Sequence, residues 1–99
     1  MARFDVYRVT NTPGYFLDVQ ADFLSYLDSR VVIPLVALDD SLIPAKRLHP
    51  CFEVEGEHVV LKTELIVAVP KASLRSAITN LTNHHDEIVS AIDFLMQGF

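Results

Sequence analysis

Apolar and polar residues alternate in short stretches along the first two thirds of the chain, and this pattern predicts β-strands. A period of two places every other side chain on one face of a sheet. Turn residues separate the stretches, because proline fixes φ and glycine permits positive φ, as in Asn11-Thr12-Pro13-Gly14 and Glu55-Gly56-Glu57. The expected strands are 3–9, 15–20, 30–36, 48–54, 58–63 and 65–69.

Two features interrupt this strand pattern. Pro34 lies in the most β-branched stretch and lacks a backbone donor, so we expect a bulge or a local edge there. The segment 38–46 combines paired aspartates, serine and proline, and is expected to be a connecting loop.

The last part of the chain changes to a helical period near residue 83. Apolar residues recur there at steps of three and four, which predicts a helix with one apolar stripe. The stripe consists of Ile88, Ala91, Ile92, Leu95 and Phe99. We expect Thr82 or Asn83 to cap the start and Gly98 to end the helix. The sequence therefore predicts one domain over 1–99 that is mainly β with one C-terminal α-helix.

Composition narrows the class of protein. The chain is 51% hydrophobic and 21% charged, which excludes intrinsic disorder and is more apolar than a small monomer needs. We therefore expect a homo-oligomer. The net charge is −5 and the basic residues are scattered, so direct nucleic-acid binding is disfavoured. No apolar run reaches the ~18 residues of a membrane helix, and no signal peptide is visible, which predicts a cytoplasmic protein.

Residues with catalytic or metal-binding chemistry form no convincing site. The acidic residues between Glu53 and Glu57 alternate around a hairpin tip and are typical of a solvated face. His84 and His85 are adjacent, so on a helix they point about a hundred degrees apart and would not chelate one ion. Cys51 is a lone cysteine, expected to be a small, half-buried residue. We predict no metal, no cofactor and no catalytic residues.

The chain ends in Leu95-Met96-Gln97-Gly98-Phe99, an unusually apolar terminus. Either Phe99 folds back onto the protein's own core, or it is held out for a partner. The residues alone favour folding back, because an exposed aromatic gains nothing by itself. Aromatic anchors are nevertheless frequent hot spots where they meet a partner.

Several segments, in order along nearly the whole chain, resemble toxins of the CcdB family. Asp18-Val19-Gln20-Ala21-Asp22 resembles the family's Asp-Val-Gln-x-Asp segment, and Arg30-Val31-Val32-Ile33-Pro34-Leu35 its Arg-x-Val-Ile-Pro-Leu strand. Phe4 and Val6-Tyr7 match its first strand. Val69-Pro70 matches a Val-Pro step before the final helix, and Glu87-Ile88, Ala91-Ile92 and Gly98 align with that helix.

The resemblance implies a fold and a function that the residue pattern does not itself show. The fold would be an SH3-like barrel of the CcdB/MazF type, and the protein a symmetric homodimer. It would bind the A subunit of DNA gyrase and trap the cleaved DNA complex. A CcdA-like antitoxin would neutralise it with a disordered tail that wraps the dimer.

The resemblance also implies a gyrase-binding site. The family binds gyrase through a Trp-Gly-Ile terminus, so Gly98 matches, Phe99 replaces isoleucine, and Gln97 stands where tryptophan is expected. Asp93 stands where the family often has asparagine. The implied gyrase-binding residues are Asp93, Met96, Gln97, Gly98 and Phe99, together with Phe23 and Leu24 after Asp22.

Two alternatives remain open at the level of sequence. The MazF and Kid endoribonuclease toxins share the implied fold, and fold does not fix function. Such an enzyme needs a cation and a proton-transfer group near a phosphate, for which Arg30 and Ser29 are the only candidate pair. The acidic charge disfavours this reading. A toxin that has lost its activity is the other alternative, because Gln97 replaces a large aromatic residue.

Overall fold

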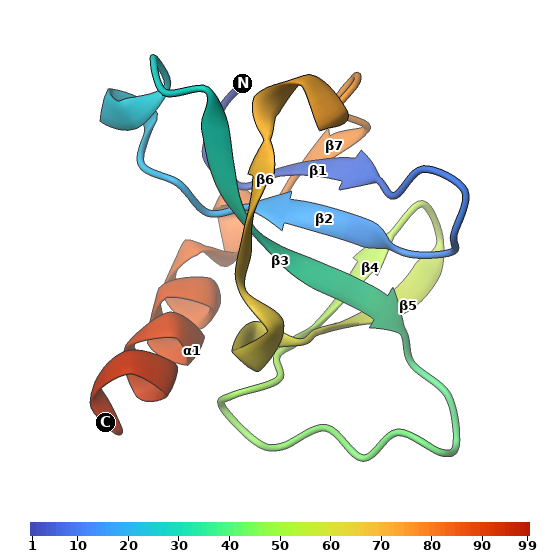
Figure 1. Ribbon diagram of the computed structural model, residues 1–99. Helices are drawn as coiled ribbons and strands as arrows, with labels where there is room; N and C mark the ends of the chain where they lie inside the picture. The colour runs from blue at the N-terminus through green and yellow to red at the C-terminus, as the bar shows by residue number, and fades with distance from the viewer.

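The computed structural model describes residues 1–99 as a mainly β protein with one C-terminal helix (Figure 1). The strands are β1 (Asp5–Arg8), β2 (Tyr15–Asp18), β3 (Ser29–Ala37), β4 (Cys51–Val54), β5 (Glu57–Leu61), β6 (Val67–Pro70) and β7 (Thr79–Asn80). Short 3₁₀ turns are η1 (Asp22–Leu24), η2 (Thr63–Leu65), η3 (Lys71–Ser73) and η4 (Thr82–His84), and the helix is α1 (His85–Gln97). With 13 residues, α1 is too short to span a membrane.

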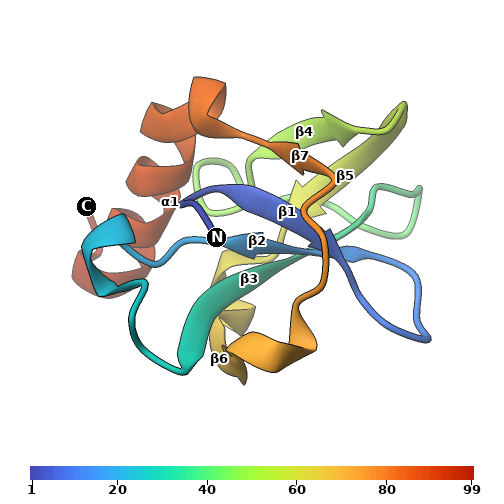
Figure 2. The ribbon, with the colours of Figure 1, turned by 90° about the horizontal axis from the view of Figure 1, so that it is seen from above.

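All neighbouring strands pair antiparallel in one sheet with the order β4-β5-β3-β2-β1-β7. The long strand β3 pairs with β2 along one edge, and β6 and β5 share its other edge. This sharing bends the sheet into a nearly closed barrel, with α1 on one side of it (Figures 1 and 2). The predicted fold class is therefore confirmed.

Pro34 lies at the point where the outer edge of β3 changes partner. The β6 ladder ends at Val32 and the β5 ladder begins at Leu35, while pairing with β2 runs through Phe16 and Pro34 without interruption. The missing proline donor therefore falls at a local edge, as predicted, and no bulge is needed.

The second predicted hairpin is confirmed with Gly56 at its tip. Val54 pairs with Glu57, so the loop contains only Glu55 and Gly56. Both have positive φ, at 52° and 78°, which is the backbone twist that a two-residue loop between antiparallel strands prefers. Glu55 adopts this conformation without being glycine, a conformation that few non-glycine residues adopt.

The start of the final helix differs from the prediction. Residues 82–84 form η4, and α1 begins only at His85, with His84 at its N-cap and no side-chain cap. The expected caps are wrong because the Thr82 hydroxyl donates to Asn80 Oδ1, and the His84 N–H donates to the Leu81 carbonyl at 2.9 Å in the preceding turn. Asp86 and Glu87 do lie in the first helical turn, where the helix dipole favours them.

The core fills the barrel and receives one face of the helix. Thirteen buried residues form the main cluster, which includes Phe4, Val6 and Ile88. Val89 and Ile92 of α1 pack against it. Full burial of a side chain such as Ile88 contributes about 1.5–3 kcal/mol, so the amino-terminal half of α1 is anchored on the barrel.

Candidate functional site

The carboxyl end of α1 is a capped helix terminus. Gly98 adopts a left-handed conformation with φ at 80°, and its backbone N–H donates to the Phe94 carbonyl at 2.9 Å. Nothing lies within 4 Å of the position that a Cβ would take there, so conformation rather than space favours glycine. Gly98 therefore ends the helix as predicted and turns the chain away from its axis.

The residues around this cap are open to solvent. Met96 is 64% exposed and Phe99 is 74% exposed; Gln97 is also exposed, and Asp93 is half-buried. The expectation that Phe99 folds back onto the core is wrong. The apolar stripe starts buried at Ile88 and ends exposed, because the helix extends past the edge of the barrel.

A second exposed apolar group lies on the turn after β2. Phe23, in η1, is 89% exposed and Tyr26 is 73% exposed, whereas Leu24 is half-buried. Both views place this turn on the same side of the barrel as α1, but at the other end of that side in Figure 1. Sequence reasoning named Phe23 and Leu24 and missed Tyr26, although an aromatic residue in a polar turn was a visible signal.

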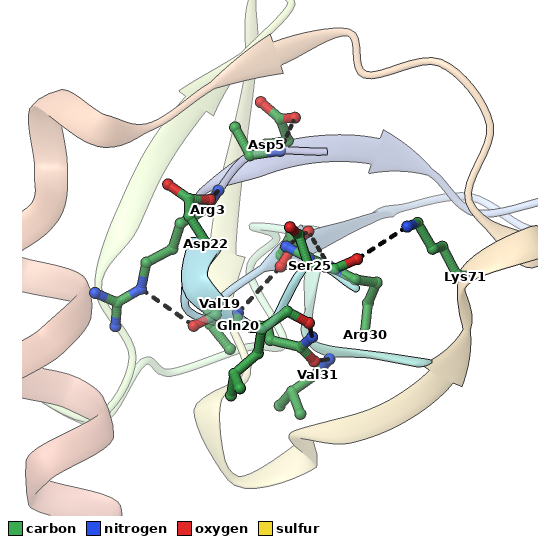
Figure 3. Close-up of polar contacts among 12 residues, drawn as sticks. Arg3, Asp5, Val19, Gln20, Asp22, Ser25, Arg30, Val31 and Lys71 are labelled. Carbon is green, nitrogen blue, oxygen red and sulfur yellow. Dashed lines mark hydrogen bonds and ion pairs between the residues drawn. The ribbon is translucent and has the colours of Figure 1, made fainter. Parts of the chain in front are cut away.

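Polar contacts from distant parts of the chain hold this turn in place (Figure 3). The Arg3 backbone N–H donates to Asp22 Oδ1 at 2.7 Å, and Arg3 Nε donates to the Val19 carbonyl at 3.2 Å. Lys71 Nζ donates to the Ser25 carbonyl at 2.9 Å. These contacts tie the turn to the amino terminus and to η3, so Phe23 projects from a fixed backbone.

The Gln20 side chain connects the same turn to β3. Its side-chain oxygen accepts from the Val31 N–H and its amide nitrogen donates to the Leu24 carbonyl, both at 3.0 Å. Its own backbone N–H donates to Asp18 Oδ1 at 3.0 Å. The buried Gln20 side chain thus gives the Val31 backbone N–H an acceptor, and it links this part of β3 to the turn.

A fully buried ion pair lies beneath this turn. Arg30 Nε donates to Asp18 Oδ2 at 2.8 Å, Nη2 lies 2.6 Å from the same oxygen, and both side chains are 0% exposed. Burial raises the pKa of the Asp18 carboxyl, and the Arg30 guanidinium opposes this rise. Arg30 is therefore engaged inside the protein and cannot reach an RNA phosphate, although Ser29 beside it is exposed.

Tyr7 belongs to the same buried polar region. Its hydroxyl donates weakly to Asp5 Oδ2 at 3.4 Å. Burial and then the negative charge of Asp5 raise the pKa of Tyr7 to about 12. The phenol is therefore neutral at physiological pH and is a structural group rather than a base.

The largest groove lies away from the helix terminus. It has a volume of about 640 Å³ and runs between the β1–β2 turn and the loop after β3. Arg8, Tyr15, Asp39 and Glu57 line it, and the Tyr15 hydroxyl donates to Glu57 at 3.1 Å. Arg8 pairs with Glu55. The groove therefore carries charges of both signs and indicates no single class of charged ligand.

The two adjacent histidines named from the sequence both make local contacts. His84 Nδ1 lies 3.1 Å from Glu87 Oε1, and its ring packs on Phe52 with centroids 4.8 Å apart. His85 packs edge-on against Phe4. Cys51 is exposed rather than half-buried. The structure contains no group of three or more His, Cys, Asp or Glu side chains that could hold a metal ion.

Comparison with known proteins gives a family match and a structural neighbour. A family model described as CcdB protein matches residues 3–98. Among solved structures, an endoribonuclease in complex with its cognate antitoxin from a mycobacterial species has a TM-score of 0.77 and 14% sequence identity. The match covers 97% of this chain and 94% of that chain. At this identity the likeness shows a shared fold alone.

Proposed function

The chain belongs to the CcdB family of toxins from toxin–antitoxin systems, and on that premise we propose that it binds the A subunit of DNA gyrase through the end of α1. Binding would trap the enzyme's cleaved DNA complex, so that double-strand breaks persist. A CcdA-like antitoxin would neutralise the toxin. The protein would act by binding and not as an enzyme.

One observation supports this proposal most strongly, the exposed aromatic terminus beyond a capped helix. Phe99 is 74% exposed and follows directly on Gly98, which fixes the direction of the chain through its hydrogen bond to Phe94. A large apolar group presented on a fixed backbone loses little conformational entropy on binding, which favours affinity. Phe23, 89% exposed on its braced turn, would add a second apolar contact.

A homodimer is part of the proposal. β6 pairs only with β3, so its other edge is free. Val67, the first residue of β6, is 45% exposed, and Leu65 of the preceding η2 is 51% exposed. A free apolar strand edge is a common site of association. In a two-fold symmetric dimer both copies of the terminus are used, which matches the two-fold symmetry of gyrase.

Gln97 distinguishes this terminus from the family pattern. It is exposed in the structure, so no local contact requires a polar residue there. Loss of the tryptophan anchor would weaken gyrase binding, and Phe99 supplies the only aromatic ring beyond the helix. We therefore propose a poison of lower affinity than a terminus with tryptophan would give.

A gyrase cleavage assay with purified protein tests the proposal. Supercoiled plasmid, gyrase from the source organism and ATP are incubated with increasing toxin, and linear DNA is measured after protein denaturation. We expect linear DNA to accumulate with the wild-type chain. A chain that lacks Gly98 and Phe99 is expected to fold normally, because both residues lie outside the core. It should not increase linear DNA, because it lacks the proposed contact with gyrase.

The matched control is Ile43→Ser, which removes an apolar side chain that is 88% exposed in the loop after β3. It should cleave like the wild type, and both variants should retain the wild-type circular dichroism spectrum. The proposal fails if wild-type protein never increases linear DNA, or if the truncated chain is as active as Ile43→Ser.

Endoribonuclease activity is the second candidate, and the observation in its favour is the similarity to a solved endoribonuclease. The burial of Arg30 argues against it, because the cation of the candidate Arg30–Ser29 pair is held inside the protein by Asp18. Incubation of the wild-type protein with RNA decides between the two. Specific RNA cleavage without any effect on gyrase would replace the first proposal.

A further inference from the structure

We propose that Arg47 is a positioning residue that braces the carboxyl-terminal turn of α1 for partner binding. The inference rests on the proposed function for the identity of the partner. Arg47 lies on the loop between β3 and β4, far from the helix in sequence. The brace itself is a property of the free protein and can be measured without a partner.

The Arg47 guanidinium makes two contacts with α1. Its Nε donates to Ser90 Oγ at 2.8 Å. Its Cζ lies 5.2 Å from the centroid of the Phe94 ring, a distance at which a cation is attracted to an aromatic face. Together these contacts span one turn of the helix, because residues four apart lie on the same face.

Phe94 links this contact to the exposed terminus. Its ring is held by Arg47, and its carbonyl accepts the hydrogen bond from the Gly98 N–H at 2.9 Å. Phe94 is 37% exposed, so the barrel alone does not enclose it. The arginine therefore supports the residue that anchors the helix cap, and through it the direction in which Phe99 leaves the helix.

The turn that presents the arginine is itself rigid. The His49 backbone N–H donates to the Ala45 carbonyl at 2.8 Å, and the Ala45 N–H donates to His49 Nδ1 at 2.9 Å. The other ring nitrogen lies 2.7 Å from Glu64 Oε1. Thr63 Oγ1 donates to the Leu48 carbonyl at 2.5 Å. The turn is thus closed on itself and fastened to η2, so the arginine acts from a fixed base.

The backbone at Arg47 supports a side-chain role. Its φ is 70°, in the left-handed region that glycine adopts more easily. A glycine would satisfy the turn with less strain, but it would supply neither the hydrogen bond to Ser90 nor the cation over Phe94. Arg47→Gly therefore separates the two effects, because it relieves the backbone while it removes the brace.

Amide hydrogen exchange at Gly98 measures the brace in the full chain. Loss of one exposed cation–π contact and one side-chain hydrogen bond should increase local opening of the end of α1 by about 5- to 30-fold. We expect exchange at Gly98 to be faster by that factor in Arg47→Gly. Ser90→Ala should show part of this increase. Because relief of the positive φ at position 47 offsets the lost contacts, the urea midpoint of Arg47→Gly should change little.

Lys46→Ala is the matched control, because it removes a neighbouring exposed cation with the same change in net charge. It should leave Gly98 exchange and gyrase affinity unchanged. Arg47→Gly should weaken the affinity for the gyrase A subunit by a factor similar to its effect on exchange, while binding of the antitoxin is retained.

Unchanged Gly98 exchange in Arg47→Gly would overturn the brace, as would an equal increase in Lys46→Ala. Faster exchange with unaltered gyrase affinity would overturn its role in partner binding. If the wild-type chain does not bind gyrase at all, the proposed function fails, and the exchange measurement still decides whether the brace exists.

Discussion

Replacement of Arg30 by methionine removes one half of a buried ion pair while it keeps much of the side-chain volume. Arg30 and Asp18 are both 0% exposed and joined by contacts of 2.8 and 2.6 Å. In Arg30→Met the Asp18 carboxylate would stay buried with only the Gln20 N–H as a partner. It must then either keep an uncompensated charge or take up a proton.

The burial of both charges determines how much unfolding free energy Arg30→Met is expected to lose. Breaking a buried pair by removing one partner destabilises a protein by about 3–5 kcal/mol. The whole stability of a domain of this size is roughly 5–15 kcal/mol, so the loss would be a large fraction of it. With a urea m value of about 2 kcal/mol/M, a loss of ~4 kcal/mol lowers the unfolding midpoint by about 2 M.

Urea unfolding followed by far-ultraviolet circular dichroism measures this directly, because the chain lacks tryptophan. All variants should be compared at one protomer concentration, since association contributes to the stability of a dimer. The double variant Asp18→Asn/Arg30→Met leaves no buried charge. It should therefore be destabilised by clearly less than the sum of the two single changes.

A midpoint within about 0.3 M of the wild type for Arg30→Met would refute the reasoning, because about 0.6 kcal/mol is typical of a solvated pair. Strict additivity of the two single variants would also contradict it. Either result would mean that Arg30 reaches solvent, which would reopen the endoribonuclease interpretation.

Three further predictions concern single side chains. Burial raises the pKa of Tyr7 to about 12, so unfolding makes this phenol easier to ionise. Its contribution to the free energy of unfolding is complete below pH ~10, and up to about 2–3 kcal/mol of it is lost as the pH rises toward 12. Tyr7→Phe should flatten the alkaline fall in stability, whereas Tyr26→Phe, at an exposed position, should not. Gln97→Trp should increase gyrase affinity about tenfold or more without a change in unfolding midpoint, as measured by surface plasmon resonance. Phe23→Ser should weaken gyrase binding by about 1–3 kcal/mol, whereas Ile43→Ser should not; equal affinities of these two variants would exclude Phe23 from the interface.

Features fixed by local chemistry were predictable from the sequence. Gly56 at the hairpin tip and Gly98 at the helix end both follow from the ease with which glycine adopts positive φ. The run of β-branched residues predicted the strand β3, and it does not alternate because adjacent Val32 and Ile33 are both buried. Pro34 was expected to mark a bulge or a local edge, and it lies where β3 changes partner.

Features that depend on distant residues were not predictable. β7 contains only Thr79 and Asn80 and exists because β1 offers it a partner. The Thr82 cap is absent because the Thr82 hydroxyl donates to the Asn80 side chain, which itself donates to the distant Arg3 carbonyl and to Asp5.

The candidate functional site also combines features that the sequence predicts with features that only the fold determines. The apolar stripe of α1 could be read from its period, but its exposed end could not, because the edge of the barrel decides where burial stops. Arg30 was named with Ser29 as a candidate catalytic pair, but its burial could not be predicted. Asp18 lies on the neighbouring strand, opposite Val32, so only strand register brings the two charges together. Arg47 meets Phe94 through a loop that carries no periodic signal.

Photo-crosslinking from position 99 tests the central claim most directly. A benzophenone side chain placed at Phe99 keeps an aromatic group beyond the Gly98 cap, and the same group at Ile43 serves as the control. After irradiation of the toxin with gyrase and DNA, we expect a covalent adduct of the A subunit from position 99 and none from position 43. Adducts from position 43 alone, or none from either position, would contradict the account.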